Sequence, residues 1–197
     1  WAAWNPSEDS TGFQPMLNRA LNETYPPGST FKVITTASAL QAGATPQTQL
    51  TAAPQIPLPD STATLENFAG SPCGGAPTTT LQYAFAHSCN TAFVQLGIDT
   101  GADALRDTAQ SFGVDAPPAP IPLQVAESTL GPVPDAAALG MSSIGQKDVA
   151  LTPLQNAMVA ATVANKGVTM QPYLVDSLKG PDLSNIATTA PTEVRRA

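Results

Sequence analysis

The chain has 197 residues with a formal net charge of −7, and 42% of them are hydrophobic while 12% are charged. This length and hydrophobic content suffice for one domain with a sizeable core. Because lysine and arginine together number 8, the chain lacks the basic surface that nucleic-acid binding requires, and nucleic acid is excluded as a partner.

The residue inventory also argues against a membrane span and a metal centre. No stretch approaches the roughly 18 consecutive apolar residues of a transmembrane helix. Two cysteines and one histidine cannot supply the four ligands of a usual structural zinc site, so no metal is expected.

The first part of the chain leads into a helix. Residues 1–22 have no regular hydrophobic period, and Trp1 and Trp4 are expected to pack against the body of the domain. A helix is predicted over residues 31–42, because apolar side chains recur there at helical spacing and Gly43 follows as a stop.

Ser29 and Lys32 form a candidate site at the start of this helix, because residues three apart share a helix face. A serine in this place is most often only an N-cap. The capping box, however, calls for Glu or Gln three residues later, and a lysine near the positive end of the helix dipole costs roughly 0.3–1 kcal/mol. The same repulsion and burial would favour the uncharged amine that a general base needs. We therefore interpret the pair as a serine nucleophile and its base, with the N-cap as the structural alternative.

The middle of the chain contains a second polar motif. Residues 45–79 are rich in proline and threonine and are predicted to form short edge strands or hairpins. Two short helices are predicted over 80–87 and 91–97, and Ser88-Cys89-Asn90 is the turn between them. Serine and asparagine are common in turns and caps, so this triplet taken alone is more often structural. A further helix is predicted over 101–112.

The last third of the chain begins with a loop. Residues 114–135 are rich in proline, which excludes a regular helix and suits a surface loop. Thr152–Gln155 is the clearest helix start in the chain, with a cap residue, a first-turn proline and Gln at the capping-box position. That helix is predicted to close at Gly167, a strand is predicted over 169–175, and the polar tail to Arg196 is predicted to begin another element.

The two polar motifs together resemble a known family. Tyr25–Lys32 (YPPGSTFK) and Ser88–Asn90 resemble the first two active-site motifs of the penicillin-binding, active-serine D,D-transpeptidases. The likeness covers about residues 4–174 and is closest to actinobacterial class B penicillin-binding proteins. Further segments resemble that class in the order in which the class has them: Asn18–Leu21, Ser143–Gln146, Thr152–Gln155 and Ala164–Gly167. The resemblance implies an α+β protein of the β-lactamase/transpeptidase-like fold, with the helical subdomain largely present and the antiparallel sheet incomplete.

The resemblance also implies roles for four residues. By position, Ser29 would be the acylated nucleophile and Lys32 its base, Ser88 would relay a proton to the leaving group, and Asn90 would hold the substrate amide. The implied donor is a peptidoglycan stem peptide ending in D-Ala-D-Ala, and an amine of a neighbouring stem is the acceptor. β-Lactams would imitate the donor and leave a slowly hydrolysed acyl-enzyme. Cell-wall synthesis proteins are the implied partners, the implied place is the extracytoplasmic face of the bacterial membrane, and no cofactor is implied.

One motif of the family is missing. Its Lys-Thr/Ser-Gly triplet, on a strand that lines the cleft, does not occur in the 197 residues and is expected beyond Ala197. Residues 1–197 would then be a partial transpeptidase domain, preceded by a membrane anchor and a dimerisation domain and followed by the strand motif. The chain by itself is expected to be poorly active or inactive.

Two other function classes stay open. A serine β-lactamase would share Ser29 and Lys32 but needs a base for deacylation. Glu127 resembles the start of the segment that supplies this base in class A β-lactamases, yet Gly131 stands where asparagine is expected, so a loop role is favoured. A non-catalytic β-lactam sensor or scaffold domain remains open because the third motif is missing. His87 beside Ser88 suggests a Ser-His pair, but a contact with a carbonyl group is the commoner use of such a histidine.

Cys73 and Cys89 are the only cysteines. The extracytoplasmic location that the resemblance implies would permit a disulfide between them, and the loop at Cys73 could fold back onto the turn at Cys89. The alternative is two buried free thiols, since cysteine packs as a small hydrophobic residue.

Overall fold

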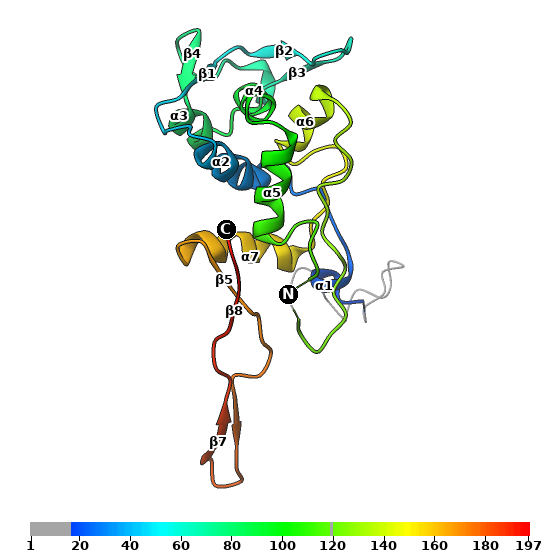
Figure 1. Cartoon of the computed structure of the whole chain (residues 1–197), viewed down its shortest axis with the longest axis vertical. Helices are drawn as coiled ribbons and strands as arrows, with labels where there is room; N and C mark the ends of the chain where they lie inside the picture. The colour runs from blue at the N-terminus through cyan, green and yellow to red at the C-terminus, as the bar shows by residue number, and fades with distance from the viewer. Residues whose placement is uncertain (1–16, 119) are drawn as a thin grey trace.

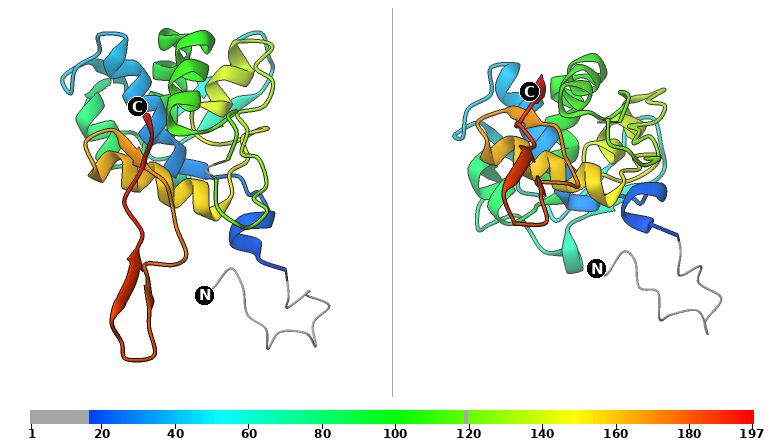
Figure 2. Two further views of the ribbon diagram at one scale, coloured as in Figure 1. Left: turned by 60° about the horizontal axis from the view of Figure 1, so that its bottom comes forward. Right: turned by 90° about the horizontal axis from the view of Figure 1, so that it is seen from below.

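The computed structural model describes residues 17–118 and 120–197, and the predicted packing of Trp1 and Trp4 lies outside these residues. The helices gather in one body, and a long arm of paired strands projects from it (Figure 1). The views in Figure 2 place helix α7 at the end of the body from which the arm extends. Among the residues that the structure describes, no helix has the length and apolar run that a bilayer crossing would require.

The helices occupy most of the predicted places. Those of the described residues are α1 (Arg19–Asn22), α2 (Lys32–Gln41), α3 (Leu81–Ala86), α4 (Asn90–Thr100), α5 (Ala102–Phe112), α6 (Ala136–Ser142) and α7 (Pro153–Ala164), with the 3₁₀ turns η2 (Gly28–Phe31) and η3 (Phe68–Gly70). The predicted helices over 31–42, 80–87, 91–97 and 101–112 are therefore confirmed within one to three residues. Helix α6 was not predicted, and α1 lies in the stretch up to residue 22 that was expected to be irregular.

Every strand of the described residues pairs antiparallel with one other strand. They are β1 (Gln49–Thr51), β2 (Gln55–Pro57), β3 (Thr64–Glu66), β4 (Thr78–Thr80), β5 (Val168–Met170), β6 (Ser177–Lys179), β7 (Asn185–Thr188) and β8 (Glu193–Arg196). The described strands pair as β1 with β4, β2 with β3, β5 with β8, and β6 with β7. Short hairpins in the proline-rich stretch are thus confirmed, and so is the element in the polar tail. The mixture of helices and antiparallel strands agrees with the predicted α+β class.

One strand prediction was too long. The strand expected over residues 169–175 ends at Met170, because Pro172 has no N–H to continue a ladder. The chain then runs into β6 and β7, an arm whose β7 residues are all exposed.

The start of α7 shows how tertiary contacts modify a local motif. The Thr152 hydroxyl accepts from the backbone N–H of Gln155, as the predicted cap requires. The return contact of a capping box is absent here, because the Gln155 side-chain amide donates to the carbonyl of Phe112 instead. The Thr152 N–H donates to the Ser128 hydroxyl. Helix α7 is therefore tied to both the end of α5 and the loop that follows α5.

In the part of the chain that the structure describes, two clusters of buried hydrophobic side chains form the core, and α2 with its preceding turn contributes to both. Phe31 and Ile34 belong to the cluster that includes side chains of α5 and α7. Ala39 belongs to the cluster that includes side chains of α3 and α4. Burial on both sides fixes the axis of α2, and with it the position of the residues at its N-terminal end.

Candidate active site

Ser29 lies in the 3₁₀ turn η2, directly before α2 rather than inside it. Gly28 has a φ of +56°, and its N–H donates to the carbonyl of Gly145 at 3.0 Å. Gly145 itself has a φ of +70°, and a Cβ there would lie 2.1 Å from the Gly28 oxygen. The turn that holds the serine is therefore clamped against the segment around Gly145, where a side chain would not fit.

The N-cap alternative for Ser29 does not describe this turn. The cap positions of η2 and α2 are Pro27 and Phe31, and neither gives a side-chain cap hydrogen bond. The Ser29 side chain is exposed, and the described part of the chain gives its hydroxyl no hydrogen-bond partner. The hydroxyl is therefore free to meet a substrate.

Lys32 is the most unusual side chain of the site, because it is a lysine that is only 2% exposed. Its Nζ donates to the carbonyl oxygen of Ser88 at 2.8 Å, to the Ser88 hydroxyl at 3.1 Å and to Oδ1 of Asn90 at 2.8 Å. It also lies 5.3 Å from the centre of the Phe93 ring. Burial lowers the pKa of Lys32 from 10.5 to about 8, since a low-dielectric surrounding disfavours the charged amine.

The second motif is shaped by the turn between α3 and α4. Ser88 has a φ of +56°, Cys89 is the N-cap of α4, and Asn90 is its first residue. This tight bend turns the Ser88 carbonyl and hydroxyl toward Lys32. The Asn90 side chain is held at both ends, because its oxygen accepts from Lys32 and its Nδ2 donates to the Glu66 carbonyl at 3.3 Å.

A disulfide and an asparagine hold the second motif in place. The structure joins Cys73 to Cys89, with Cα atoms 5.8 Å apart. Asn67 accepts from the backbone N–H of Thr91 at 3.0 Å, and its Nδ2 donates to the carbonyl oxygens of Ala53 and Ser71. The segment after β3 is thereby tied to the first turn of α4. Asn67 was not expected from the sequence, because no local pattern marks its stretch. Phe93 lies in the helix predicted over 91–97, where the apolar period marks it as a packing residue and not as a neighbour of Lys32.

A groove of about 220 Å³ opens beside Ser88, and its lining includes Phe68, Tyr83 and His87. Nδ1 of His87 lies 3.0 Å from the Tyr83 carbonyl, and the two rings stack with centres 3.8 Å apart. His87 thus makes the carbonyl contact that was expected of it. Glu127 is exposed in the loop between α5 and α6.

The structure brings three of the four proposed site residues into direct contact and places the fourth one turn away. Lys32, Ser88 and Asn90 share hydrogen bonds, although Ser88 is 56 residues from Lys32 in sequence. Ser29 precedes Lys32 on the continuous η2–α2 helix. An exposed hydroxyl, a buried amine of lowered pKa and a second hydroxyl are the groups that acyl transfer through a serine ester requires.

Comparisons with known proteins agree with this geometry. The family described as penicillin binding protein transpeptidase domain matches residues 2–196. Peptidoglycan D,D-transpeptidase PbpA of Mycolicibacterium smegmatis is 71% identical over 195 residues, which are 99% of this chain and 40% of that protein.

Solved structures agree as well. The penicillin G acyl-enzyme complex of penicillin-binding protein A from M. tuberculosis is 69% identical, with a TM-score of 0.88 over 95% of this chain and 44% of that chain. The D,D-transpeptidase domain of a peptidoglycan glycosyltransferase from Eggerthella lenta is 31% identical, with a TM-score of 0.78 over 96% and 48%. The chain spans about 40% of the length of the mycobacterial D,D-transpeptidases that it matches. It belongs to the penicillin-binding protein transpeptidase domain family.

Proposed function

We propose that the whole protein is a peptidoglycan D,D-transpeptidase whose acyl-enzyme forms on Ser29. The observation that carries this proposal is the buried Lys32 amine, which lies one turn after an exposed serine and contacts the hydroxyl and amide of the second motif. A purely structural lysine would rarely be buried against neutral acceptors at the start of a helix.

The hydrogen-bond inventory of Lys32 suggests how the amine changes its role. As an ammonium it has three N–H groups, which match its three acceptors on Ser88 and Asn90. As a neutral amine it has two N–H groups and one lone pair. The carbonyl and the amide oxygen can only accept, so the lone pair is left to a hydroxyl, either that of Ser88 or that of Ser29. Loss of one proton therefore turns Lys32 into an acceptor for a serine hydroxyl.

The proposed reaction follows from that change. Neutral Lys32 takes the proton of the Ser29 hydroxyl while Oγ attacks the carbonyl carbon of the penultimate D-Ala. The backbone N–H of Ser29, which has no intrahelical acceptor at the start of the turn, donates to the oxyanion. Ser88 passes a proton from Lys32 to the departing amine, the terminal D-Ala leaves, and Ser29 carries an ester. An acceptor amine then attacks this ester, and the proton it loses returns to the Ser29 oxygen.

The substrates and partners belong to the same proposal. We infer that the donor is a stem peptide ending in D-Ala-D-Ala, that Asn90 binds its amide, and that β-lactams acylate the same serine. Relatives named as peptidoglycan D,D-transpeptidases support this. Cell-wall synthesis proteins on the extracytoplasmic face of the membrane are the proposed partners. A β-lactamase is less well supported, because the sequence offered only Glu127 as a deacylating base and Glu127 is an exposed loop residue.

The lifetime of a penicillin adduct separates these functions. The whole protein is incubated with a labelled penicillin, free label is removed, and the bound label is followed with and without a D-amino acid as acceptor. A transpeptidase should retain the label for many minutes and transfer a D-Ala-D-Ala peptide to the acceptor. Rapid release of hydrolysed label would indicate a β-lactamase, and a stable adduct without transfer would indicate a sensor. No adduct would refute every penicillin-recognising function.

A further inference from the structure

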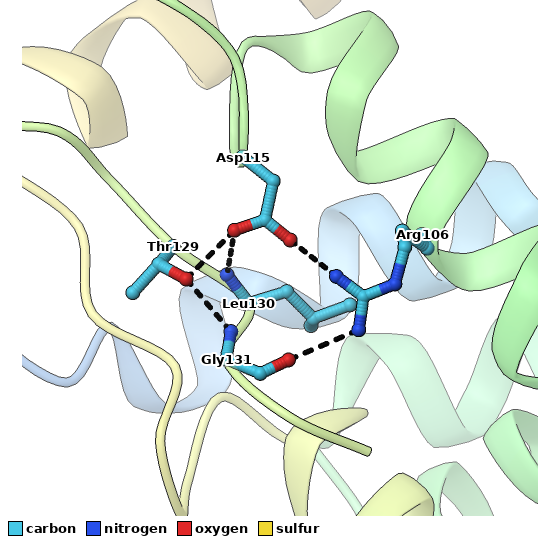
Figure 3. A network of polar contacts seen from close by, with 5 residues as sticks. All are labelled: Arg106, Asp115, Thr129, Leu130 and Gly131. Carbon is cyan, nitrogen blue, oxygen red and sulfur yellow. Dashed lines mark hydrogen bonds and ion pairs between the residues drawn. The ribbon is translucent and has the colours of Figure 1, made fainter.

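A polar network outside the proposed catalytic groups joins α5 to the loop that follows it (Figure 3). Arg106 donates to Asp115 at 2.5 Å and to the Gly131 carbonyl at 3.0 Å. The other oxygen of the Asp115 carboxylate accepts from the Thr129 hydroxyl at 2.7 Å and from the Leu130 N–H at 3.1 Å. The Thr129 hydroxyl accepts in turn from the Gly131 N–H at 2.8 Å. The ion pair therefore binds three consecutive residues, Thr129 through its hydroxyl and the next two through their backbone.

Those three positions are the first step of a backbone path to the nucleophile. Thr129 exchanges two backbone hydrogen bonds with Ala150, at 2.8 and 2.9 Å. The next residue, Leu151, exchanges two with Tyr25, both at 2.9 Å. From Tyr25 the chain reaches Ser29 through two prolines and one glycine, and the prolines restrict the backbone between them. Paired backbone hydrogen bonds thus link the loop at Thr129 to the segment 150–151, and this segment to Tyr25.

The network differs from an ordinary surface ion pair, which contributes little. Asp115 has a φ of +53°, so the chain bends sharply where its carboxylate is placed. Its side chain is 18% exposed, and Leu130, whose N–H it binds, is fully buried. The Leu130 side chain packs in the same core cluster as Phe31 and Leu151. The Asp115 carboxylate thus binds the backbone of Leu130, and the Leu130 side chain packs in the same core cluster as Phe31 of the nucleophile turn.

We propose that Arg106 and Asp115 are positioning residues for Ser29. Together they set the register of the loop 129–131, and through Thr129 this loop sets the position of Ala150 and of the adjoining Leu151. Leu151 in turn sets the position of Tyr25 and of the turn that follows it. Loss of the pair lets this path shift, and Ser29 then moves relative to Lys32. The inference rests on the proposed function, because it assigns the purpose of the network to acylation of that serine.

The test compares two variants with a matched control in the whole protein. Asp115→Asn keeps an oxygen acceptor and a residue type that tolerates positive φ, but it loses the charge that holds Arg106. Arg106→Lys can reach only one of the two Arg106 acceptors. Glu193→Gln removes a carboxylate that pairs with Arg196 on β8 at 2.8 Å, away from the path. For each protein, labelled-penicillin acylation is measured at saturating and subsaturating concentrations, which separates binding from the acylation step. The melting temperature and amide hydrogen exchange are measured alongside.

Misplacement of a reacting group by about 1 Å can slow a reaction by roughly 100-fold. The acylation rate constant of Asp115→Asn is therefore expected to fall at least tenfold, that of Arg106→Lys by a smaller factor, and that of Glu193→Gln by less than twofold. The fraction of protein that reacts should stay near that of the wild type, and the Tyr25 and Leu151 amides should exchange faster. A lower melting temperature with an unchanged rate constant would overturn the inference, and so would no change at all.

Two further results have a defined meaning. If Asp115→Asn does not fold, Arg106→Lys decides, and an unchanged rate constant in that folded variant overturns the inference. If the wild type forms no adduct, the proposed function fails. The exchange of the Tyr25 amide then decides whether the network holds the path, since unchanged exchange in the variants overturns that step separately.

Discussion

Replacement of Lys32 by methionine tests the proposed base while keeping an unbranched side chain of similar length in the buried site. With a pKa of about 8, roughly one amine in ten is uncharged at pH 7, whereas an unshifted lysine with pKa 10.5 would leave about one in 3,000 uncharged. Burial thus raises the concentration of the reactive form about 300-fold. Methionine has no base to offer, and general base catalysis contributes about 10²- to 10⁴-fold.

The acylation rate constant of Lys32→Met is therefore expected to fall by about 10²- to 10⁴-fold. In the wild type, the rate constant should rise nearly tenfold for each pH unit below about 8 and then level off, because only the neutral amine accepts the proton. Rapid-quench measurements with a labelled penicillin between pH 6 and 9 provide both values. Lys179→Met, at an exposed position in β6, is the matched control and should keep the rate and profile of the wild type.

The same titration should appear in the free energy of unfolding. Because the pKa of Lys32 is about 8 in the folded chain and near 10.4 when unfolded, the folded state binds fewer protons between these values. Stability should therefore rise with pH across this window, by up to about 3 kcal/mol, and the rise should be missing in Lys32→Met. A Lys32→Met variant that acylates within threefold of the wild type, or a wild-type rate that does not rise from pH 6 to 8, would refute the assignment.

Three further changes probe the surroundings of the site. The double replacement of Cys73 and Cys89 by alanine should lower the free energy of unfolding by about 3 kcal/mol, since the bridge closes a loop of 16 residues. Two thiols per chain that react with a labelling reagent in the denatured, unreduced wild type would show that no bridge exists. Asn90→Ala removes an acceptor from the buried ammonium, so the midpoint of the acylation pH profile should move to lower pH, and an unmoved or higher midpoint would contradict the contact. Gly145→Ala places a Cβ 2.1 Å from a backbone oxygen of the nucleophile turn and should lower both the melting temperature and the acylation rate. The control Gly43→Ala, at a position with φ of +99° and open space, should cost only about 1–2 kcal/mol of backbone strain. Equal losses of unfolding free energy in urea for the two variants would contradict the close contact between Gly145 and the nucleophile turn.

The sequence predicted the local part of the site better than its tertiary part. Proline, glycine and a helical period are local signals, and they located Ser29 and Lys32 on one helical turn. The contact between Lys32 and the Ser88 turn joins residues 56 positions apart, so only the family resemblance could suggest it. The burial of Lys32, which sets its pKa, depends on Phe93 and on the packing of α4 against α2, and no local pattern encodes it.

Elements without a one-sided hydrophobic pattern were missed. Helix α6 contains Gly140 and a run of alanines, which give little periodic signal. All four residues of β7 are exposed, so the alternation that usually marks a strand is absent. Only one of the two capping-box contacts predicted at α7 forms. The Thr152 N–H binds Ser128 and the Gln155 side chain binds Phe112, so these two groups do not bind each other.

Mapping of the acylated residue tests the central claim most directly. Trypsin cleavage after Arg19 and Lys32 releases a peptide that contains Ser29 and no other serine, while Ser88 falls in the next peptide. After reaction of the whole protein with penicillin, mass spectrometry should find the added mass on the peptide 20–32 at Ser29, and Ser29→Ala should carry none. Added mass on the peptide 33–106, or an adduct that persists in Ser29→Ala, would contradict the account.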